Sequence, residues 1–377
     1  MRALWIDDAW PRVSLGAGHP RGLALLQALA ACSDEVVVCP TQSPPAADIV
    51  AAAAAGVRWS RLPPPFTAAG LANWLGREAA FDLLWVGRPH NMALVAAARR
   101  LRPEHFAGTR IVYDAEAVFA LRALRRRALE GNPASDVKAG HLIRNELYPI
   151  AAADAAVAVS SVEAELLTRH TRLPVAVLGH SAPPVPTQPS FGERNGLLFV
   201  GPVEPPDDPN GDSLRWFLQQ VTPAFASPRP ALVIVGRGSG AGSWLAPLLA
   251  PGDAGLGGVD DLTPHYARAR VFVAPTRFAA GIPLKVIDAA RHGVPVVATT
   301  LLAGQLGWQP GVELLAADDP ARFAAAVAML HDDAALWARI RAAALAAVVR
   351  DFDPGRFAAT VRAVACGQPA GAGRVLH

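Results

Sequence analysis

Two side chains of this sequence, Lys285 and Asp288, have the types and the spacing to handle a charged ligand. Three positions apart on a helix, they would lie on one face, one turn from each other. A lysine there can neutralise the charge that builds on a phosphate leaving group, and a carboxylate can accept hydrogen bonds from ribose hydroxyls. The alternative is an ion pair between the two on an exposed helix surface, which would stabilise the helix by only about 0.2–0.5 kcal/mol.

The residues around this pair predict a loop that leads into a helix. A strand over 271–275 is followed by a loop with Gly281, by Pro283 at the first helical position, and by a helix that stops at Gly293. Free backbone N–H groups and the positive end of the helix dipole at such a place form a natural seat for a diphosphate. We therefore expect a nucleotide donor to be bound by Gly281, Ile282, Leu284, Lys285 and Asp288.

Short β-branched runs alternate with helical stretches along both halves of the chain, and they would position this loop. In the first half the runs lie at 2–7, 35–40, 57–62, 82–87, 110–115, 155–160 and 175–179. In the second half they lie at 197–201, 231–236, near Gly258, and at 271–275, 295–299 and 312–317. Strand followed by helix, many times over, predicts parallel sheets covered on both faces. The fold class is therefore α/β, with two Rossmann-like, doubly wound domains.

Length and composition predict how the chain is divided into domains. Its 377 residues suit two domains, because single cores seldom grow beyond about 250–300 residues. A proline-rich stretch reads as a linker between them. We expect an N-terminal domain over 1–182, a linker over 183–195, a nucleotide-sugar-binding domain over 196–351, a last helix over 352–366 and a tail over 367–377.

The stretch 271–299 resembles the donor-binding segment of family 4 glycosyltransferases, the glycosyl transferases group 1. In that family two glutamates stand eight positions apart; Asp288 occupies the second position and Ala280 the first, and Gly-x-Pro-Val-Val follows at 293–297. A subgroup that also lacks the first glutamate reads Arg-Phe-Gly-Ala-Gly-Ile-Lys-Gly-Lys. This chain matches it at Arg277, Phe278, Ala280, Gly281, Ile282 and Lys285, with Pro283 and Leu284 in place of the lysine and the glycine. The resemblance implies the GT-B fold, in which two Rossmann-like domains face each other across a cleft.

The resemblance extends to both sides of this segment. Residues 196–223 resemble the first strand and helix of the family's C-terminal domain, although the loop 202–208 is acidic where many relatives carry an arginine and a lysine for the phosphates. Gly258 and Val259 stand in a turn similar to the one that holds the nucleotide base, with a plain capping turn as the alternative. Residues 352–364 resemble the last helix, which in the family returns to the N-terminal domain.

A glycine pair follows the first predicted strand. Gly16 and Gly18 would allow the backbone to lie close to a ligand. In the family, a glycine loop at this place lies near the donor phosphates and the acceptor. The alternative is a turn without a ligand, which is what glycines most often serve.

Two further loops follow strands of the first half and should face the same cleft. Arg88 and His90 come after the strand at 82–87, and Asp114 and Glu116 come at the end of the next. By the resemblance these loops contain catalytic residues, so Arg88, His90, Asp114 and Glu116 join Lys285 in the candidate catalytic set. For His90 a structural role stays open, because a lone histidine at a loop is often structural.

The resemblance implies transfer of a sugar from a nucleotide-sugar donor to a hydroxyl acceptor, with retention of configuration and without a divalent metal. No Asp-x-Asp motif stands at a predicted strand end, and no cofactor beyond the cosubstrate is expected. Bacterial relatives build polysaccharides and glycoconjugates, so the acceptor classes are glycan, lipid-linked and protein acceptors.

Other functions compete with this interpretation. A non-catalytic relative that binds nucleotide sugars or glycans is the main alternative, because Ala280 and the acidic loop depart from the family pattern. A dinucleotide oxidoreductase would need a Gly-x-Gly-x-x-Gly after a strand, with an acid about 20 residues on, which the predicted strands lack. An epimerase or a phosphorylase of the same fold is a further alternative.

Charge and composition limit the partners. The net charge is +3, and the arginines are mostly scattered among acids, so nucleic acid is not implied. The one dense cluster, at 122–127, is either a solvated helix face or a docking surface for phosphate or anionic lipid. No window approaches the roughly 20 apolar residues of a membrane span, and the three cysteines have no metal-ligand spacing. We expect a cytoplasmic protein with at most peripheral contact at the inner face of the membrane.

Overall fold

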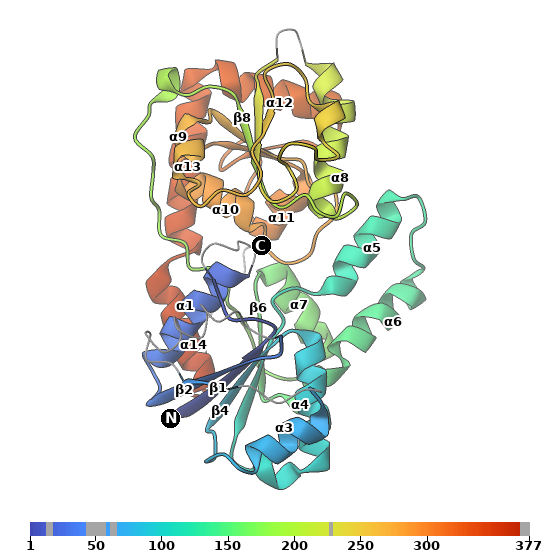
Figure 1. Cartoon of the computed structure of the whole chain (residues 1–377), viewed down its shortest axis with the longest axis vertical. Coiled ribbons are helices and arrows are strands. Elements are labelled where there is room, and N and C mark those ends of the chain that lie inside the picture. Colours follow the sequence, from blue (N-terminus) through green and yellow to red (C-terminus); the bar gives the residue numbers. More distant parts are fainter. Residues whose placement is uncertain (13–17, 43–57, 61–65, 226–228, 370–377) are drawn as a thin grey trace. The chain divides into compact units, whose positions relative to one another are not determined.

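The computed structural model describes residues 1–12, 18–42, 58–60, 66–225 and 229–369 (Figure 1). The chain forms two compact units. The first contains Met1–Leu124, Ala134–Ser181 and Pro354–His377, and the second contains Arg125–Pro133 and Ala182–Asp353. Each unit is built on its own sheet, so the alternation of strands and helices is realised twice.

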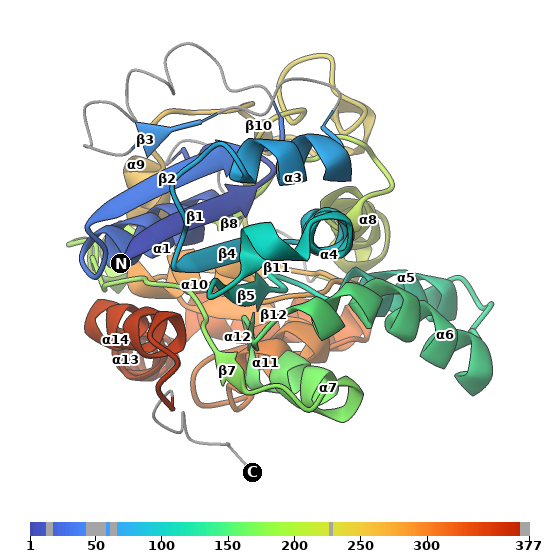
Figure 2. The ribbon, with the colours of Figure 1, turned by 90° about the horizontal axis from the view of Figure 1, so that it is seen from below.

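The sheet of the first unit is parallel throughout, in the order β3-β2-β1-β4-β5-β6-β7. Figure 2 shows β2, β1 and β4 side by side in this sheet. The strands are β1 (Arg2–Asp7), β2 (Glu35–Pro40), β3 (Arg58–Trp59), β4 (Leu83–Gly87), β5 (Arg110–Asp114), β6 (Ala155–Ala158) and β7 (Val175–Val177). The helices are α1 (His19–Ala30), α3 (Ala68–Leu75), α4 (Pro89–Leu101), α5 (Phe119–Leu129), α6 (Asp136–Leu147), α7 (Ser161–His170) and α14 (Pro354–Ala365).

Both faces of this sheet are buried, which explains why its strands are apolar at consecutive positions. Because side chains alternate along a strand, Trp5 packs with α1 and α14 on one face, while Leu4 and Ile6 pack with α3 and α4 on the other. Of the runs predicted as strands, the one over 57–62 is described only as the two residues of β3.

The second sheet is also parallel, in the order β10-β9-β8-β11-β12-β13. Its strands are β8 (Leu197–Val200), β9 (Leu232–Val235), β10 (Ala254–Gly255), β11 (Val271–Ala274), β12 (Val296–Ala298) and β13 (Leu315–Ala316). Its helices are α8 (Pro209–Trp216), α9 (Thr263–Arg268), α10 (Leu284–Arg291), α11 (Thr300–Leu306), α12 (Pro320–Asp332) and α13 (Ala334–Asp351). The short strand predicted near Gly258 is β10, which ends earlier, at Gly255.

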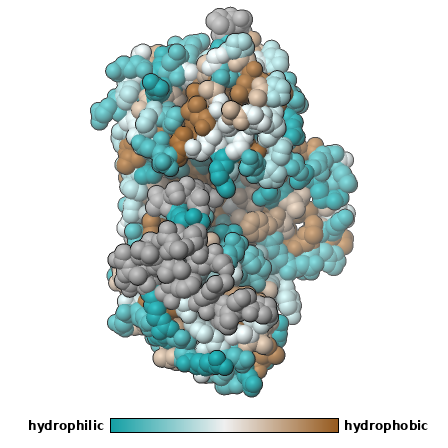
Figure 3. Space-filling model, in the orientation of Figure 1, coloured by the Kyte–Doolittle hydropathy of each residue, from teal (hydrophilic) through white to brown (hydrophobic). Residues whose placement is uncertain are grey.

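Helices cover both faces of the second sheet. One core joins Phe272 to Val286, Ile287 and the end of α13, and the other joins Phe199 and Val273 to α8 and α12. On the face that Figure 3 shows, the hydrophobic residues of this unit occur in small separate groups. Among the described helices, none combines the length and the apolar character needed to cross a bilayer.

Candidate functional site

The ammonium group of Lys285 is held between two neighbours that come from other elements of the second unit. Its Nζ donates a hydrogen bond to Oδ1 of Asn210, in the first turn of α8, and lies 4.7 Å from the ring centroid of Phe199 in β8. Burial lowers the pKa of Lys285 to about 8, against the opposing effect of Asp208. A partly desolvated cation at a helix N-terminus interacts strongly with an incoming anion, because little water screens it.

Asp288 lies one turn further along α10 and pairs with another group. Its Oδ1 lies 3.6 Å from Nη1 of Arg291, and burial raises the pKa of the carboxyl to about 6. In the described part of the chain Asp288 therefore pairs with Arg291, and Lys285 contacts Asn210 and Phe199. The exposed ion pair between Lys285 and Asp288, the alternative that the spacing allowed, is absent.

The loop before α10 turns at a glycine. Gly281 has a φ of +76°, in the left-handed region that favours glycine, and α10 begins at Leu284 without a side-chain cap. The backbone N–H of Leu284 donates within the loop to the carbonyl of Ile282, at 3.0 Å. Of the amides predicted to bind a diphosphate, that of Leu284 thus donates within the loop itself.

Two glycines bring Asn210 to Lys285. A Cβ at Gly236 would lie 2.0 Å from the carbonyl oxygen of Gly201, and a Cβ at Gly201 would lie 2.8 Å from Nδ2 of Asn210. The loops after β8 and β9 can approach this closely only because both residues lack side chains. Asp208 then caps α8 by accepting hydrogen bonds from the backbone of Asn210 and Gly211, at 2.8 and 2.9 Å. The acidic character of the loop 202–208 is thus partly structural.

The turn predicted to hold a nucleotide base follows β10. Gly257 has a φ of +73°, and its carbonyl accepts a hydrogen bond from the backbone of Gly236, at 2.7 Å. A Cβ at Gly258 would meet only the flexible side chain of Arg237, at 3.6 Å, and Val259 packs against the core that contains α10. The turn is therefore linked by its backbone to the glycine-rich loop after β9.

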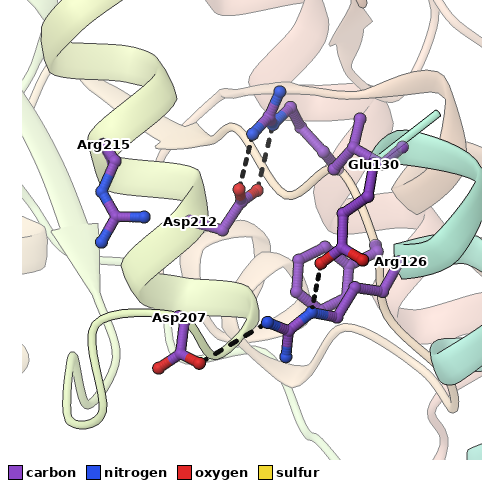
Figure 4. A pocket seen from close by; sticks show the side chains of 8 residues that line it. Arg126, Glu130, Asp207, Asp212 and Arg215 are labelled. Carbon is purple, nitrogen blue, oxygen red and sulfur yellow. Dashed lines mark hydrogen bonds and ion pairs between the residues drawn. The ribbon is translucent and has the colours of Figure 1, made fainter. Parts of the chain in front are cut away.

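A cavity of about 170 Å³ lies in the second unit beside these loops (Figure 4). Arg277 binds Asp212 through two hydrogen bonds, of 3.0 and 2.5 Å, and Arg126 lies 2.8 Å from Glu130 and 3.5 Å from Asp207. The cavity is lined by Arg126, Leu129, Glu130, Asp207, Asp212, Arg215, Arg277 and Phe278. Because three cations face three carboxylates, the lining carries no excess positive charge with which to attract a phosphate.

Two arginines of the cluster on α5, Arg125 and Arg126, belong to the part of this helix that is assigned to the second unit and contact residues there. Nη1 of Arg125 donates to the carbonyl of Ala279, at 2.6 Å, and Arg126 lines the cavity of Figure 4. Arg122 is the one member of the cluster that is exposed, and Arg125, Arg126 and Arg127 are partly buried. The cluster is therefore neither wholly a solvated face nor wholly free for an external partner.

In the first unit, Arg88 and Glu116 stand at the ends of the neighbouring strands β4 and β5. Both have a positive φ, of 72° and 50°, which is costly for residues with a side chain. Nη2 of Arg88 lies 3.0 Å from Glu116, and its Nε lies 2.9 Å from Asp7 and 3.3 Å from Asp8. Strain of this kind is found at functional sites, where the surrounding contacts hold it in place.

Burial controls the protonation of these carboxyls. Burial, together with the charge of the neighbouring Asp7, raises the pKa of Glu116 to about 7 against the opposing effect of Arg88. Burial likewise raises the pKa of Asp7. For Asp8 the effect of burial is outweighed by hydrogen bonds from His90 and Asn91, so its pKa is lowered.

Asp7, Asp8, Arg88 and Glu116 line a cavity of about 180 Å³. The cavity also contains Gly18, where a Cβ would lie 3.1 Å from Oε1 of Glu116, so the glycine leaves room for that carboxylate. His90 is largely exposed, and its Nε2 lies 2.6 Å from Oδ1 of Asp8. The partner of Gly18 in the predicted pair, Gly16, lies outside the described residues.

Asp114 differs from the other predicted catalytic residues because it is buried, with 1% of its surface exposed. Its two oxygens accept hydrogen bonds from Arg21, at 2.9 and 3.0 Å, and one also accepts from Nε1 of Trp85, at 3.0 Å. Arg21 in turn donates to the carbonyls of Leu178 and Gly179. Asp114 thus supports the strand ends from inside the core and does not line the cavity.

Comparison with known proteins finds one family model within the second unit and solved structures that match nearly the whole chain. Residues 194–333 match the model of the family described as glycosyl transferases group 1. HepE of Anabaena, solved in complex with UDP-glucose, matches 97% of this chain over 100% of its own, with a TM-score of 0.69 and 15% identity. The chain has the GT-B fold. Sucrose-phosphate synthase of Thermosynechococcus elongatus shares it, with a TM-score of 0.69 and 15% identity over 95% of this chain and 96% of its own.

A third GT-B structure, a glycosyltransferase of Rickettsia africae, matches with a TM-score of 0.66 and 11% identity over 94% of this chain and 95% of its own. No curated protein matches the chain in sequence. The GT-B fold class predicted from the sequence is confirmed, and so is the resemblance to group 1, which the family model finds within the second unit.

Sequence reasoning missed Asn210 and Phe199 as site residues. Asn210 stands directly after the Asp208–Pro209 start of a helix that follows a glycine-ended strand, which is a usable signal. No sequence signal marks Phe199 as a site residue, because the alternation of strands and helices predicts only that it lies in the core. Among the residues described here, no group of three or more His, Cys, Asp or Glu side chains could hold a metal ion.

Proposed function

We propose that this protein is a glycosyltransferase that moves a sugar from a nucleotide-sugar donor to a hydroxyl acceptor. The observation that carries the proposal is the environment of Lys285: a partly desolvated ammonium group at the start of α10, inside the segment that matches glycosyl transferases group 1. A partly desolvated cation is suited to stabilise the negative charge of the diphosphate that departs when the glycosidic bond of the donor breaks.

The roles of the donor-binding residues follow from their places on the second unit. Lys285 and the amides of Gly281 and Ile282 would bind the diphosphate, and Asp288 would accept hydrogen bonds from the ribose hydroxyls. The turn at Gly258 and Val259 would hold the base. Leu284, whose amide is engaged in the loop, would shape this site by packing.

A UDP-sugar is the donor to test first. The HepE structure contains UDP-glucose, and a pneumococcal O-GlcNAc transferase, at a TM-score of 0.57 over 79% of this chain, was solved with UDP and GlcNAc. Both are similar to this chain in fold. The choice of uracil, and of the sugar, is part of the proposal.

The first unit would supply the acceptor side. Arg88, His90 and Glu116 line or border its cavity, and the Glu116 carboxylate would accept a hydrogen bond from the acceptor hydroxyl. Asp114 would act indirectly, by holding Arg21 beneath the strand ends. We further propose that configuration is retained and no metal is needed, with the departing diphosphate receiving the acceptor proton. The acceptor would be a glycan, lipid-linked or protein hydroxyl in bacterial surface glycan synthesis, on the cytoplasmic side, with peripheral membrane contact at most.

A non-catalytic nucleotide-sugar-binding protein is the second candidate. Ala280 replaces one family glutamate, and in the Figure 4 cavity three carboxylates balance the charge of three arginines. Such a protein would bind the donor and never release a nucleoside diphosphate from it.

Thermal unfolding against UDP, GDP, dTDP, CMP, ADP and NAD, each with and without EDTA, tests the donor first. A ligand at 100 times its Kd stabilises the folded protein by about 2.7 kcal/mol, which moves the melting temperature measurably. We expect one nucleoside diphosphate to stand out regardless of EDTA, and UDP release from UDP-glucose in the presence of an acceptor extract. Binding without release would favour the second candidate, and a shift with NAD alone would overturn both.

A further inference from the structure

The linker between the two units is attached to the last turn of α10, the helix that carries Lys285 and Asp288. The backbone N–H of Val185 donates to the carbonyl of Arg291, at 2.9 Å. The backbone and the hydroxyl of Thr187 both donate to the carbonyl of His292, each at 3.0 Å. The open carbonyls at the end of this helix are thus capped by the linker rather than by water.

The guanidinium group of Arg291 contacts both sides of this attachment. Its Nε donates to the linker carbonyl of Pro183, at 2.9 Å, and its Nη1 lies 3.6 Å from Oδ1 of Asp288. A guanidinium is planar, so fixing Nε on a carbonyl also fixes the direction in which Nη1 points. Arg291 is thus oriented by the linker and faces the carboxylate.

The surrounding contacts hold the backbone of Asp288 in place. Nδ1 of His292 lies 2.7 Å from the carbonyl of Asp288, and the ring of His292 stacks on Tyr266, with centroids 4.4 Å apart. The buried guanidinium of Arg194 donates to the carbonyl of Tyr266, at 2.9 Å, and to the hydroxyl of Thr187, at 2.7 Å. Linker, α9 and the end of α10 therefore form one hydrogen-bonded assembly, in which Arg291 is the described partner of the Asp288 carboxylate.

We propose that Arg291 is a positioning residue that orients the Asp288 carboxylate toward the ribose of a bound nucleoside diphosphate, with the Pro183 carbonyl of the linker as its anchor. The inference rests on the proposed binding of a nucleotide along α10. Arg291 itself touches no part of the nucleotide in this arrangement, and it acts through Asp288.

The charges around Asp288 give this role a measurable signature. Burial raises the pKa of Asp288 to about 6, and the positive charge of Arg291 opposes that rise. Tyr266 is neutral because burial raises its pKa, and burial lowers the pKa of His292, so that neither replaces Arg291. Lys285, one turn away, contacts Asn210, and the negative charge of Asp261 opposes the lowering of the pKa of His292. Without Arg291 the carboxyl would hold its proton to higher pH and lose its capacity as an acceptor.

Calorimetric titration of the full chain with UDP, between about pH 5.5 and 8, tests this inference. For the wild type we expect affinity to fall as the pH drops through about 6, because Asp288 becomes protonated. For Arg291→Gln the acid limb should move up by about one pH unit, which weakens binding by about twofold at pH 7 and by about eightfold at pH 5.5. Arg291→Lys keeps the charge and loses the planar anchor, so the limb should stay in place while affinity falls a few-fold. Arg268→Gln, at an exposed position of α9, removes the same charge elsewhere and should match the wild type.

The outcomes separate this inference from the proposed function. A wild type that binds neither UDP nor another nucleoside diphosphate refutes the proposed function, and the role of Arg291 with it. A wild type that binds UDP, with Arg291→Gln showing the same affinity and the same acid limb, overturns the role of Arg291 alone. Should Arg291→Gln fail to fold by circular dichroism, Arg291→Lys decides: wild-type affinity there overturns the anchoring by Pro183, and a weaker affinity with an unmoved limb supports it.

Discussion

Replacing Lys285 by methionine removes the ammonium group while keeping an unbranched side chain of similar length. Burial lowers the pKa of Lys285 to about 8, so at neutral pH about nine in ten molecules still carry the charge. Loss of one preorganised charge contact to a transition state lowers turnover by about 100- to 1,000-fold. We therefore expect Lys285→Met to reduce the turnover of UDP-glucose by about 100-fold or more.

The pH dependence of kcat/KM gives a second, independent test of the role of Lys285. As the pH rises through about 8, the ammonium group of Lys285 loses its proton, so kcat/KM of the wild type should fall about tenfold for each further pH unit. The diphosphate, once bound, favours the protonated form, so kcat should hold to higher pH than kcat/KM. Lys285→Met has no such group, and its residual activity should be flat over this alkaline range.

The small number of lysines in the chain provides a matched control for this assay. Lys285 is one of two lysines in the sequence, and the other, Lys138, is exposed on α6. Lys138→Met is therefore the matched control, and we expect wild-type rates of UDP release from it. In that variant, labelling by trinitrobenzenesulfonate, followed peptide by peptide with mass spectrometry to separate Lys285 from the N-terminal amine, should show a midpoint near pH 8 and protection by UDP. Wild-type turnover or an unchanged alkaline limb in Lys285→Met would refute the reasoning.

Three further perturbations follow from the structure. Asp288→Asn should weaken UDP binding about tenfold in calorimetry, with kcat nearly unchanged, because ribose contacts are made equally in ground and transition states; a selective loss of kcat would contradict this. Glu116→Gln should remove an acid limb near pH 7 from the transfer rate and leave UDP affinity intact, whereas an unmoved limb would assign that titration to another group. Gly236→Ala should lower the midpoint of thermal unfolding by several degrees, since the new Cβ would lie 2.0 Å from the carbonyl oxygen of Gly201. Gly304→Ala, where a Cβ meets nothing within 4 Å, is the control. Equal midpoints for the two variants would contradict the packing argument.

The fold was predictable because its strands are buried on both faces. A strand such as β4, with every residue buried, can only read as a continuous apolar run, and helices between such runs force parallel pairing. The helix that carries Lys285 and Asp288 was predictable for a similar reason, since glycine and proline mark its ends and the spacing of three residues fixes the shared face.

The partners of these residues were not predictable. Asn210 lies 75 positions from Lys285, and its place depends on how closely two glycine loops approach each other. Asp114 illustrates the same limit. Its position at a strand end predicts a site residue, yet its carboxylate is buried and accepts two hydrogen bonds from the guanidinium group of Arg21. Which side chains meet is decided by tertiary packing, and a single sequence contains no record of it.

The division of the chain has a consequence for the order in which the protein can fold during synthesis. The first unit is completed by Pro354–His377, and Phe357 and Val361 of α14 cover the same apolar face as Leu25 of α1. The ribosome must translate residues 182–353 before α14 exists, which takes on the order of ten to thirty seconds at about 5–20 residues per second. Through that interval the face around Leu25 is bare, and a chain stalled within the second unit would display it to chaperones and proteases.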